Sequence, residues 1–187
     1  MKAVYVDLHH GLVLECRNGN RKAHNELYKL YSRAMFNIAM RILNDEDEAE
    51  DVLQEAFVDA FNRIADFRQE TSFGMWMKQI VINRSISQLR KHKIELISID
   101  DTDVDFIPDS GISNTEEIEF QVKQVRAAIQ ELPDGYRIVL TLYLLEGYDH
   151  EEISHILRIS ENTSRTQFMR AKRKLVDILR SKGICYN

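Results

Sequence analysis

The sequence is poor in residues that interrupt helices and in residues that cross-link small folds. Two prolines and seven glycines among 187 residues leave little to break a helix, which favours an all-α fold. The two cysteines, Cys16 and Cys185, lie near opposite ends and form no CxxC pair, which argues against a disulfide framework and against a zinc site. This cysteine content suits a reducing cytoplasm, and we expect no metal ion or other cofactor.

Long apolar runs and catalytic motifs are missing as well. The N-terminus, MKAVYVDLHH, has one lysine and a short apolar stretch that ends at Asp7, which is too little for a signal peptide. No apolar run approaches membrane-spanning length, so we expect a cytoplasmic protein that does not insert into a membrane. Because no glycine-rich phosphate loop or nucleophile motif is present, we also expect no enzymatic activity and no small-molecule substrate.

What the sequence does contain is charge sorted into blocks of one sign, within a net charge of -5. Residues 42–62 carry eight acids and no base, and residues 71–93 carry five bases and no acid. Residues 94–122 carry nine acids and no base, whereas residues 158–182 carry eight bases against two acids. The basic blocks favour binding of a polyanion such as duplex DNA. The acidic blocks favour a basic protein partner, although a solvated helix face is the more common explanation of any single block.

Helical periodicity predicts an N-terminal bundle over residues 1–92. Apolar residues recur at helical spacing over about residues 21–43, and a second stripe runs from Ala49 to Ile64. The polar stretch FRQETSF then predicts a loop before a third helix over about residues 72–91.

The rest of the chain predicts an acidic flexible linker and a second small helical domain. Residues 93–114 lose the periodicity and combine acids with Pro108 and Gly111, as linkers do. Residues 115–187 resume it with a helix that breaks at Pro133. We expect the next helix to bury one apolar stripe, formed by Tyr136, Val139, Leu140, Tyr143 and Leu144.

The C-terminal part of this second domain has the pattern of a helix-turn-helix. Asp149 and Glu152 have the spacing of a capping box for a short helix that ends near Leu157. A three-residue turn follows, and Ser160 is a suitable N-cap for a longer basic helix. In such a motif the second helix enters a DNA major groove. The residues that we expect to contact DNA from this helix are Thr163, Arg165, Thr166, Gln167, Arg170 and Arg173.

A zinc enzyme is the alternative that the segment HEEISH suggests. His150 and His155 are five residues apart, about 140° around a helix, unlike the i, i+4 pair of a metalloprotease. The two imidazoles therefore do not share a helix face, and we expect no metal site here.

Three stretches together resemble the bacterial RNA polymerase sigma factors of the extracytoplasmic-function type. They are NELYKLYSRAMFNIAMRILNDEDEAEDVLQEAFVDAF, FGMWMKQIVINRSISQLRK and LPDGYRIVLTLYLLEGYDHEEISHILRISENTSRTQFMRAKRKL. The resemblance covers about residues 12–180. It implies a protein that binds core RNA polymerase and promoter DNA, with the helix-turn-helix on the −35 element and the N-terminal domain on the melted −10 element. It also implies an anti-sigma factor as a partner.

The resemblance assigns residues to two further surfaces. The stretch DEAEDVLQE matches the family's polymerase-docking motif and implies that Asp51, Gln54 and Glu55 contact core polymerase. In the family, the loop before the third helix holds a flipped-out −10 base, and polar groups and an aromatic face suit that task. The residues so implicated in −10 binding are Phe67, Arg68, Thr71, Ser72, Phe73, Lys78, Asn83 and Arg84.

The sequence departs from the family pattern at two places in the helix-turn-helix. Arg158 stands where glycine is usual, so either an arginine adopts a left-handed conformation or the turn differs. Gln167 stands where a basic residue is common, which predicts an altered base preference. Two other functions remain as alternatives: a free-standing helix-turn-helix regulator, which would bind DNA without polymerase, and a decoy that sequesters an anti-sigma factor.

Overall fold

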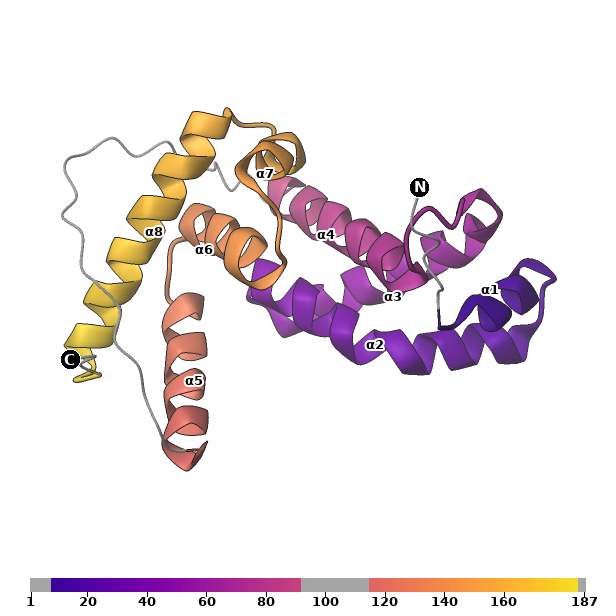
Figure 1. The fold of residues 1–187 in the computed structure, drawn as a ribbon, viewed down its shortest axis with the longest axis horizontal. Coiled ribbons are helices and arrows are strands. Elements are labelled where there is room, and N and C mark those ends of the chain that lie inside the picture. The colour runs from indigo at the N-terminus through magenta and orange to yellow at the C-terminus, as the bar shows by residue number, and fades with distance from the viewer. Residues whose placement is uncertain (1–7, 92–114, 185–187) are drawn as a thin grey trace, which may run out of the picture. The chain divides into compact units, whose positions relative to one another are not determined.

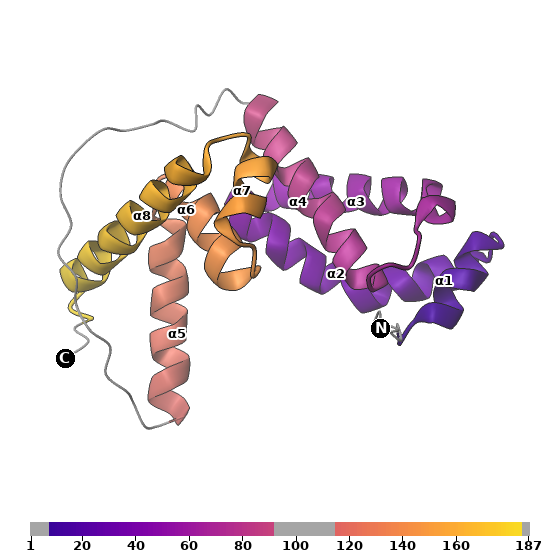
Figure 2. The same cartoon turned by 45° about the horizontal axis from the view of Figure 1, so that its top comes forward.

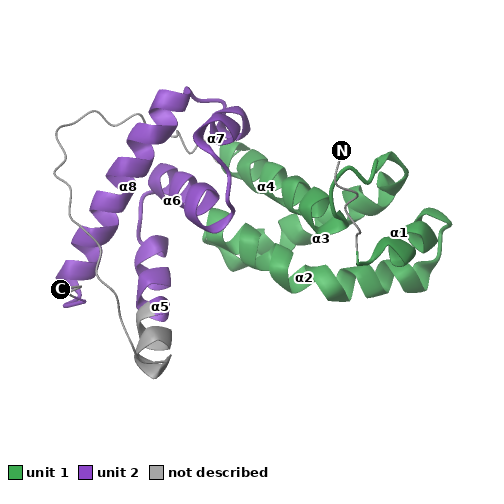
Figure 3. Cartoon of the chain, in the orientation of Figure 1, with its two compact units in different colours: residues 1–93 green, residues 94–187 purple. Residues whose placement is uncertain are grey.

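A computed structural model describes residues 8–91 and 115–184, with side chains in the second range described from residue 122. Every regular element within these ranges is helical, as the sequence predicts (Figure 1). The chain divides into two compact units, residues 1–93 and 94–187 (Figure 3). The expected linker, residues 93–114, lies outside the described residues. Among the helices that are described, none is long and apolar enough to cross a membrane.

The first unit is a bundle of three long helices with a short helix at its start. Its elements are α1 (His10–Arg17), α2 (Arg21–Leu43), α3 (Glu46–Asn62), a single 3-10 turn η1 (Ile64–Asp66) and α4 (Phe73–Lys91). Helices α2, α3 and α4 pack against one another, and α1 packs against α2 and η1 (Figures 1 and 2). Sequence periodicity predicted the three long helices, whereas α1 was not predicted.

Local side-chain chemistry explains where α2 and α3 begin. The Asn20 side chain accepts a hydrogen bond from the Lys22 amide, and the Asp45 carboxylate accepts one from the Glu48 amide. Both caps satisfy amides that the helix itself leaves without a partner. The fully buried side chains of this unit include Val13, Leu27, Ile42, Phe73, Met77, Val81 and Ile82.

The second unit is built around the long C-terminal helix. Its elements are α5 (Thr115–Gln130), α6 (Asp134–Leu140), a π-helical turn η2 (Thr141–Leu145), α7 (His150–Leu157) and α8 (Glu161–Ser181). Helix α8 packs against α5, α6 and α7 (Figures 1 and 2). Ile129, Leu132, Leu140 and Ala171 form a buried apolar cluster between these helices.

The apolar stripe predicted for α6 and its continuation is wrong at its C-terminal end. Tyr143 and Leu144 are 37% and 54% exposed, whereas Leu142 is fully buried. The reason is the π turn, in which the Glu146 amide donates to the Thr141 carbonyl five residues earlier at 3.0 Å. A π turn holds more residues than an α turn, so the positions within it rotate away from the stripe.

Candidate nucleic-acid interface

Capping interactions define where the two helices of the helix-turn-helix begin and where the first one ends. The Asp149 carboxylate accepts from the Glu152 amide at 2.8 Å, and the Glu152 carboxylate accepts from the Asp149 amide at 2.9 Å. This confirms the predicted capping box. Arg158 adopts φ 57° and ψ 44°, which confirms the left-handed alternative at the turn. Ser160 Oγ then accepts from the Thr163 amide at 3.0 Å and starts α8.

An aromatic cluster holds α8 against α7 and the turn before it. The His150 ring stacks on Tyr143 with a centroid distance of 4.6 Å, and Phe168 packs against Tyr143 at 4.5 Å. His150 Nδ1 and Ser164 Oγ share a hydrogen bond of 2.9 Å. Burial lowers the pKa of His150, and nearby Arg165 lowers it further, which favours the neutral imidazole. His150 therefore belongs to the packing of the motif. Among the described residues no cluster of potential metal ligands occurs.

The outward face of α8 carries most of the residues expected to contact DNA. Arg165, Thr166 and Arg173 are exposed, whereas Thr163 and Arg170 are half-buried. Arg165 forms an ion pair with Glu161 one turn earlier, and the Thr166 hydroxyl donates to the Asn162 carbonyl at 2.9 Å. Both contacts lie within α8 and leave its side chains facing solvent. The N-terminal half of α8 thus presents arginine and threonine side chains at the surface.

The prediction that Gln167 projects toward DNA is wrong. Its side chain is only 4% exposed, and it lies on the same face of α8 as the buried Ser164 and Ala171. Helical geometry explains this, because residues three and four apart share a face. Neither the amide nitrogen nor the amide oxygen of Gln167 has a hydrogen-bond partner among the described residues.

The prediction that Phe67 or Phe73 offers a stacking face to a base is also wrong for this structure. Phe67 is 3% exposed and Phe73 is fully buried. Phe67 stacks on Trp76 at 5.0 Å with an interplanar angle of 29°, and Phe73 meets Trp76 at 5.9 Å. Phe67, Phe73 and Trp76 form a layer under the loop, called the aromatic floor below. Their ring faces pack against one another.

The polar residues of the loop between Phe67 and Phe73 remain available at the surface. Arg68 and Thr71 are exposed, and Ser72 is half-buried. Ser72 Oγ accepts from the Met75 amide at 3.1 Å, so Ser72 also caps the start of α4. The exposed groups of this loop are therefore polar donors and acceptors, which can bond to a base edge.

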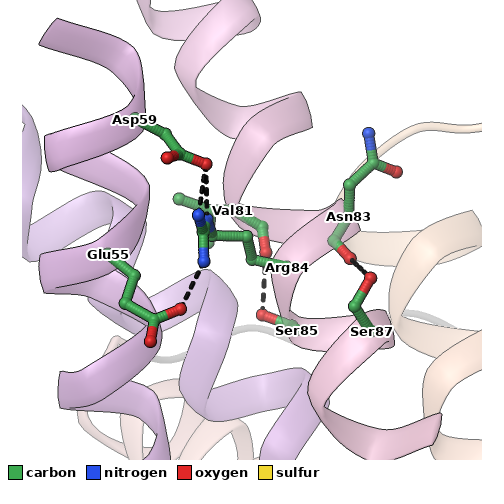
Figure 4. A network of polar contacts seen from close by, with 7 residues as sticks. All are labelled: Glu55, Asp59, Val81, Asn83, Arg84, Ser85 and Ser87. Atoms are coloured by element: carbon green, nitrogen blue, oxygen red, sulfur yellow. Dashed lines mark hydrogen bonds and ion pairs between the residues drawn. The ribbon is translucent and has the colours of Figure 1, made fainter. Parts of the chain in front are cut away.

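Helix α4 directs its expected DNA-binding residues to different sides. Asn83 is exposed and points away from α3, whereas the Arg84 guanidinium lies between Glu55 and Asp59 of α3 (Figure 4). Arg84 Nε donates to Asp59 at 2.8 Å, and its two other nitrogens pair with Asp59 and Glu55. The side chain of Arg84 is 31% exposed. Lys78, which lies in α4 between the loop and Arg84, is half-buried. Arg84 thus links α4 to the acidic helix.

The acidic helix α3 keeps its predicted polymerase-binding residues on its outer side. Asp51, Gln54 and Glu55 are exposed, while the intervening Val52 and Leu53 are buried. Gln54 also borders an open groove of about 400 Å³ between α2 and α3. The other residues that line this groove are Tyr28, Ser32, Arg33, Phe36, Glu46, Glu50 and Leu53. The groove was not predicted, because its aromatic residues come from α2 and only the packing of α2 on α3 brings them beside Gln54.

Comparison with known proteins gives matches over both units. The sequence matches the families described as Sigma-70 region 2, over residues 27–94, and Sigma-70, region 4, over residues 123–175. The ECF RNA polymerase sigma factor SigM of Bacillus subtilis is 32% identical over 152 residues, which cover 81% of this chain and 91% of SigM. The RNA polymerase sigma-H factor of Pseudomonas aeruginosa is 29% identical over 174 residues, covering 86% and 88% of the two chains.

The fold also has solved counterparts. The sigma factor RpoE from Bartonella quintana, solved in complex with the anti-sigma factor NepR, superposes with a TM-score of 0.54 at 19% identity. The match covers 83% of this chain and 96% of that one. At this identity the likeness concerns the fold.

Proposed function

The chain belongs to the sigma-70 family, as an RNA polymerase sigma factor of the extracytoplasmic-function type, and on this premise we propose how its two units divide promoter recognition. A sigma factor directs transcription initiation, so a free-standing regulator is set aside. Sigma factors are generally not enzymes. In our proposal the second unit reads the −35 element, the first unit captures the −10 element, and α3 docks on core polymerase in the cytoplasm.

The observation that carries the −35 assignment is the outward face of α8. Arg165 and Thr166 are exposed near the N-terminal end of the helix, the end that contacts base edges in helix-turn-helix proteins. An arginine can bond a guanine edge with two hydrogen bonds, and a good pair of this kind discriminates against the wrong base by about 1 to 3 kcal/mol. Thr163 and Thr166 can contribute further base contacts. Arg170 and Arg173 follow along the helix, and in this proposal they contact phosphates.

The −10 assignment rests on the polar loop above the aromatic floor. A base that leaves the duplex needs hydrogen-bonding groups for its edge, and Arg68, Thr71 and Ser72 supply them. Lys78 and Asn83 extend the surface along α4. Phe67 and Phe73 are buried beside the loop, so their ring faces are not accessible to a base in this conformation. Arg84 acts through its ion pairs with α3, which join the DNA-binding helix to the polymerase-binding helix.

Core polymerase is the proposed partner of the acidic helix. Asp51, Gln54 and Glu55 are exposed on α3. The negative charge of this helix face is complementary to a basic protein surface. The adjacent groove adds Tyr28 and Phe36 as apolar contacts, which charge alone would not supply. We also propose an anti-sigma factor as a second partner. The support is that related folds have been solved with such partners, as RpoE has with NepR.

In vitro transcription tests the −35 assignment. Core polymerase stripped of sigma subunits is combined with the purified chain and a library of promoter fragments, and transcribed templates are sequenced. We expect one enriched two-part element. The variant Arg165→Ala should lose preference at one upstream position by about 1 to 3 kcal/mol, while the downstream preference is unchanged.

A second arginine of the same helix is the matched control. Arg180 is exposed about four turns further along α8, near its C-terminal end, and Arg180→Ala should leave the upstream preference unchanged. Absence of any enriched element would contradict the proposed function. Equal upstream preferences in Arg165→Ala and the unmodified chain would contradict the role of Arg165 alone.

A further inference from the structure

Arg17, the last residue of α1, reaches the segment that precedes the polar loop. Its Nε donates to the Ile64 carbonyl at 3.2 Å, and its Nη2 donates to the Phe67 carbonyl. These two carbonyls lie 47 and 50 positions further along the chain. The Arg17 guanidinium therefore ties α1 to the first residue of η1 and to Phe67, the residue at which the loop begins.

Phe67 is held on two sides by this arrangement. Arg17 fixes its carbonyl, while its ring stacks on Trp76 and meets Phe73 edge to face at 6.1 Å. The aromatic contacts continue through Tyr31, which packs against Phe73 at 5.2 Å and shares a hydrogen bond of 2.8 Å with His9. Arg17 thus contacts the residue at which the loop begins, and His9, the residue before α1, is linked to Phe73 through Tyr31. At the far side of the loop, Ser72 caps α4.

The shape of the arginine side chain is what makes this contact specific. A guanidinium presents several N–H donors in a planar fork and can bond two acceptors at once, whereas a lysine ammonium is a compact point charge on a flexible stem. The η1 turn by itself satisfies the Ile64 carbonyl only weakly, through the Phe67 amide at 3.4 Å. The two-point contact therefore restricts the backbone just where the loop leaves the bundle.

We propose that Arg17 is a positioning residue for capture of the −10 base. This inference rests on the proposed function of the loop and adds to it a residue on α1 that does not touch DNA. Holding the Phe67 carbonyl pre-organises the loop, so that Arg68, Thr71 and Ser72 lose less conformational freedom when a base binds. Loss of Arg17 should weaken −10 capture and base discrimination, and should leave polymerase docking and −35 recognition unchanged.

Three variants of the full chain test this role. Arg17→Gln removes the charge and the fork, and Arg17→Lys keeps the charge but cannot hold both carbonyls in the same way. Arg21→Gln is the control, because Arg21 is an exposed arginine four positions away whose side chain forms no hydrogen bond or ion pair with any residue that the structure describes. Each variant is assembled with core polymerase, and its binding to two fork-junction templates is measured. One template carries the preferred −10 element and the other carries the same element with one substituted base.

We expect Arg17→Gln to reduce the ratio of binding to the two templates by about fivefold, which corresponds to one net hydrogen bond. Arg17→Lys should show most of the same loss, and Arg21→Gln none. Affinity for core polymerase and preference at the upstream element should match the unmodified chain in all three variants. In the free chain, the only tryptophan, Trp76, should become more accessible to acrylamide quenching in Arg17→Gln, because its stacking partner Phe67 is less restrained.

The outcomes separate the role of Arg17 from the proposed function. If the unmodified chain discriminates between the templates and Arg17→Gln discriminates equally well, Arg17 has no positioning role. Full rescue by Arg17→Lys would show that charge alone suffices, and would also overturn the proposal. A fall in polymerase affinity together with discrimination would reduce Arg17 to a general structural role. If the unmodified chain itself shows no preference between the templates, the loop is not the −10 site.

Discussion

The two units of this sigma factor differ in how they carry the residues expected to contact DNA. In the second unit these residues lie on one helix, α8, and all but Gln167 are exposed or half-buried. In the first unit they come from a loop and from α4, where Phe67 and Phe73 are buried and Arg84 is bound to the acidic helix. The second unit therefore presents its expected DNA-binding residues along one helix, whereas the first unit combines such residues with the buried side chains that support the loop.

The difference predicts that in the first unit a residue can serve DNA binding without being able to reach DNA. Aromatic rings that a family resemblance places beside the flipped base form the floor of the loop, and Arg17 holds the loop from outside. Substitutions in the first unit should therefore alter stability and binding together. In the second unit, stability and binding should respond to different residues. The following predictions test this contrast, beginning with the largest expected effect.

The largest expected effect is the loss of stability that Phe73→Ala causes in the first unit. The ring is fully buried and contacts Tyr31, Phe67 and Trp76, so its removal leaves a cavity in the aromatic floor. We expect a loss of about 3 to 5 kcal/mol in the free energy of unfolding. Denaturant unfolding followed by Trp76 fluorescence measures this unit alone, because the chain has one tryptophan. The exposed loop residue gives the control: Thr71→Ala should leave stability within about 0.5 kcal/mol. A loss below about 1 kcal/mol for Phe73→Ala would place the ring outside the core.

Gln167→Met should separate stability from binding in the second unit. Methionine has nearly the shape of glutamine and removes two buried polar atoms that have no partner in the described structure, so α8 should gain about 1 to 2 kcal/mol. Hydrogen exchange of the α8 amides measures the stability of this unit. Binding to the −35 element should be unchanged. Thr166→Ala should do the opposite, with weaker binding and unchanged exchange. If Gln167→Met instead destabilises α8 and weakens binding, Gln167 leaves the core to reach DNA.

Sequence reasoning predicted α2, α3 and α8 well because each one combines a buried apolar stripe with a capping residue. Asp149 and Ser160 were readable as N-caps, and each one makes its cap contact. Whether a helical side chain faces the core or the solvent was predicted less well. Gln167 lies three residues after Ser164 and four before Ala171, so strict use of the period would have assigned it to the core.

The features that sequence reasoning missed depend on contacts between distant segments. Nothing in the sequence near Arg17 indicates that it bonds the carbonyls of Ile64 and Phe67. The pairing of Arg84 with Glu55 and Asp59 is of the same kind, although the opposite charges of α3 and α4 were visible in the sequence. The π turn after α6 has no recognisable residue signature and became evident only from its backbone hydrogen bonds.

The left-handed residues that end one helix in each unit allow a direct comparison of strain. Asn44 ends α2 with φ 59°, and Arg158 ends α7 with φ 57°. Asparagine tolerates this region better than arginine does, so Arg158→Gly should stabilise the second unit by up to about 1 kcal/mol and Asn44→Gly the first by less. Thermal unfolding measures the change caused by Arg158→Gly in the second unit. Unfolding followed by Trp76 fluorescence measures the change caused by Asn44→Gly in the first unit. Equal gains at both positions would show that the nature of the L-residue is unimportant there.

The smallest expected effect is a pH dependence confined to the second unit. Burial lowers the pKa of His150 below its usual range, Arg165 adds to the lowering, and Glu161 and Asp149 oppose it. A histidine whose pKa is lower when folded binds fewer protons in the folded state, so the second unit should be most stable above about pH 7 and lose stability as the pH falls toward 5. Hydrogen exchange of α8 at several pH values, corrected for the intrinsic exchange rate, measures this loss. His150→Asn can keep a hydrogen bond to Ser164 without titrating and should flatten the pH dependence, whereas His155→Asn, at an exposed position of the same helix, should not. A second unit that gains stability toward pH 5 would mean that the cluster prefers the imidazolium, and that the carboxylates of Glu161 and Asp149 outweigh burial.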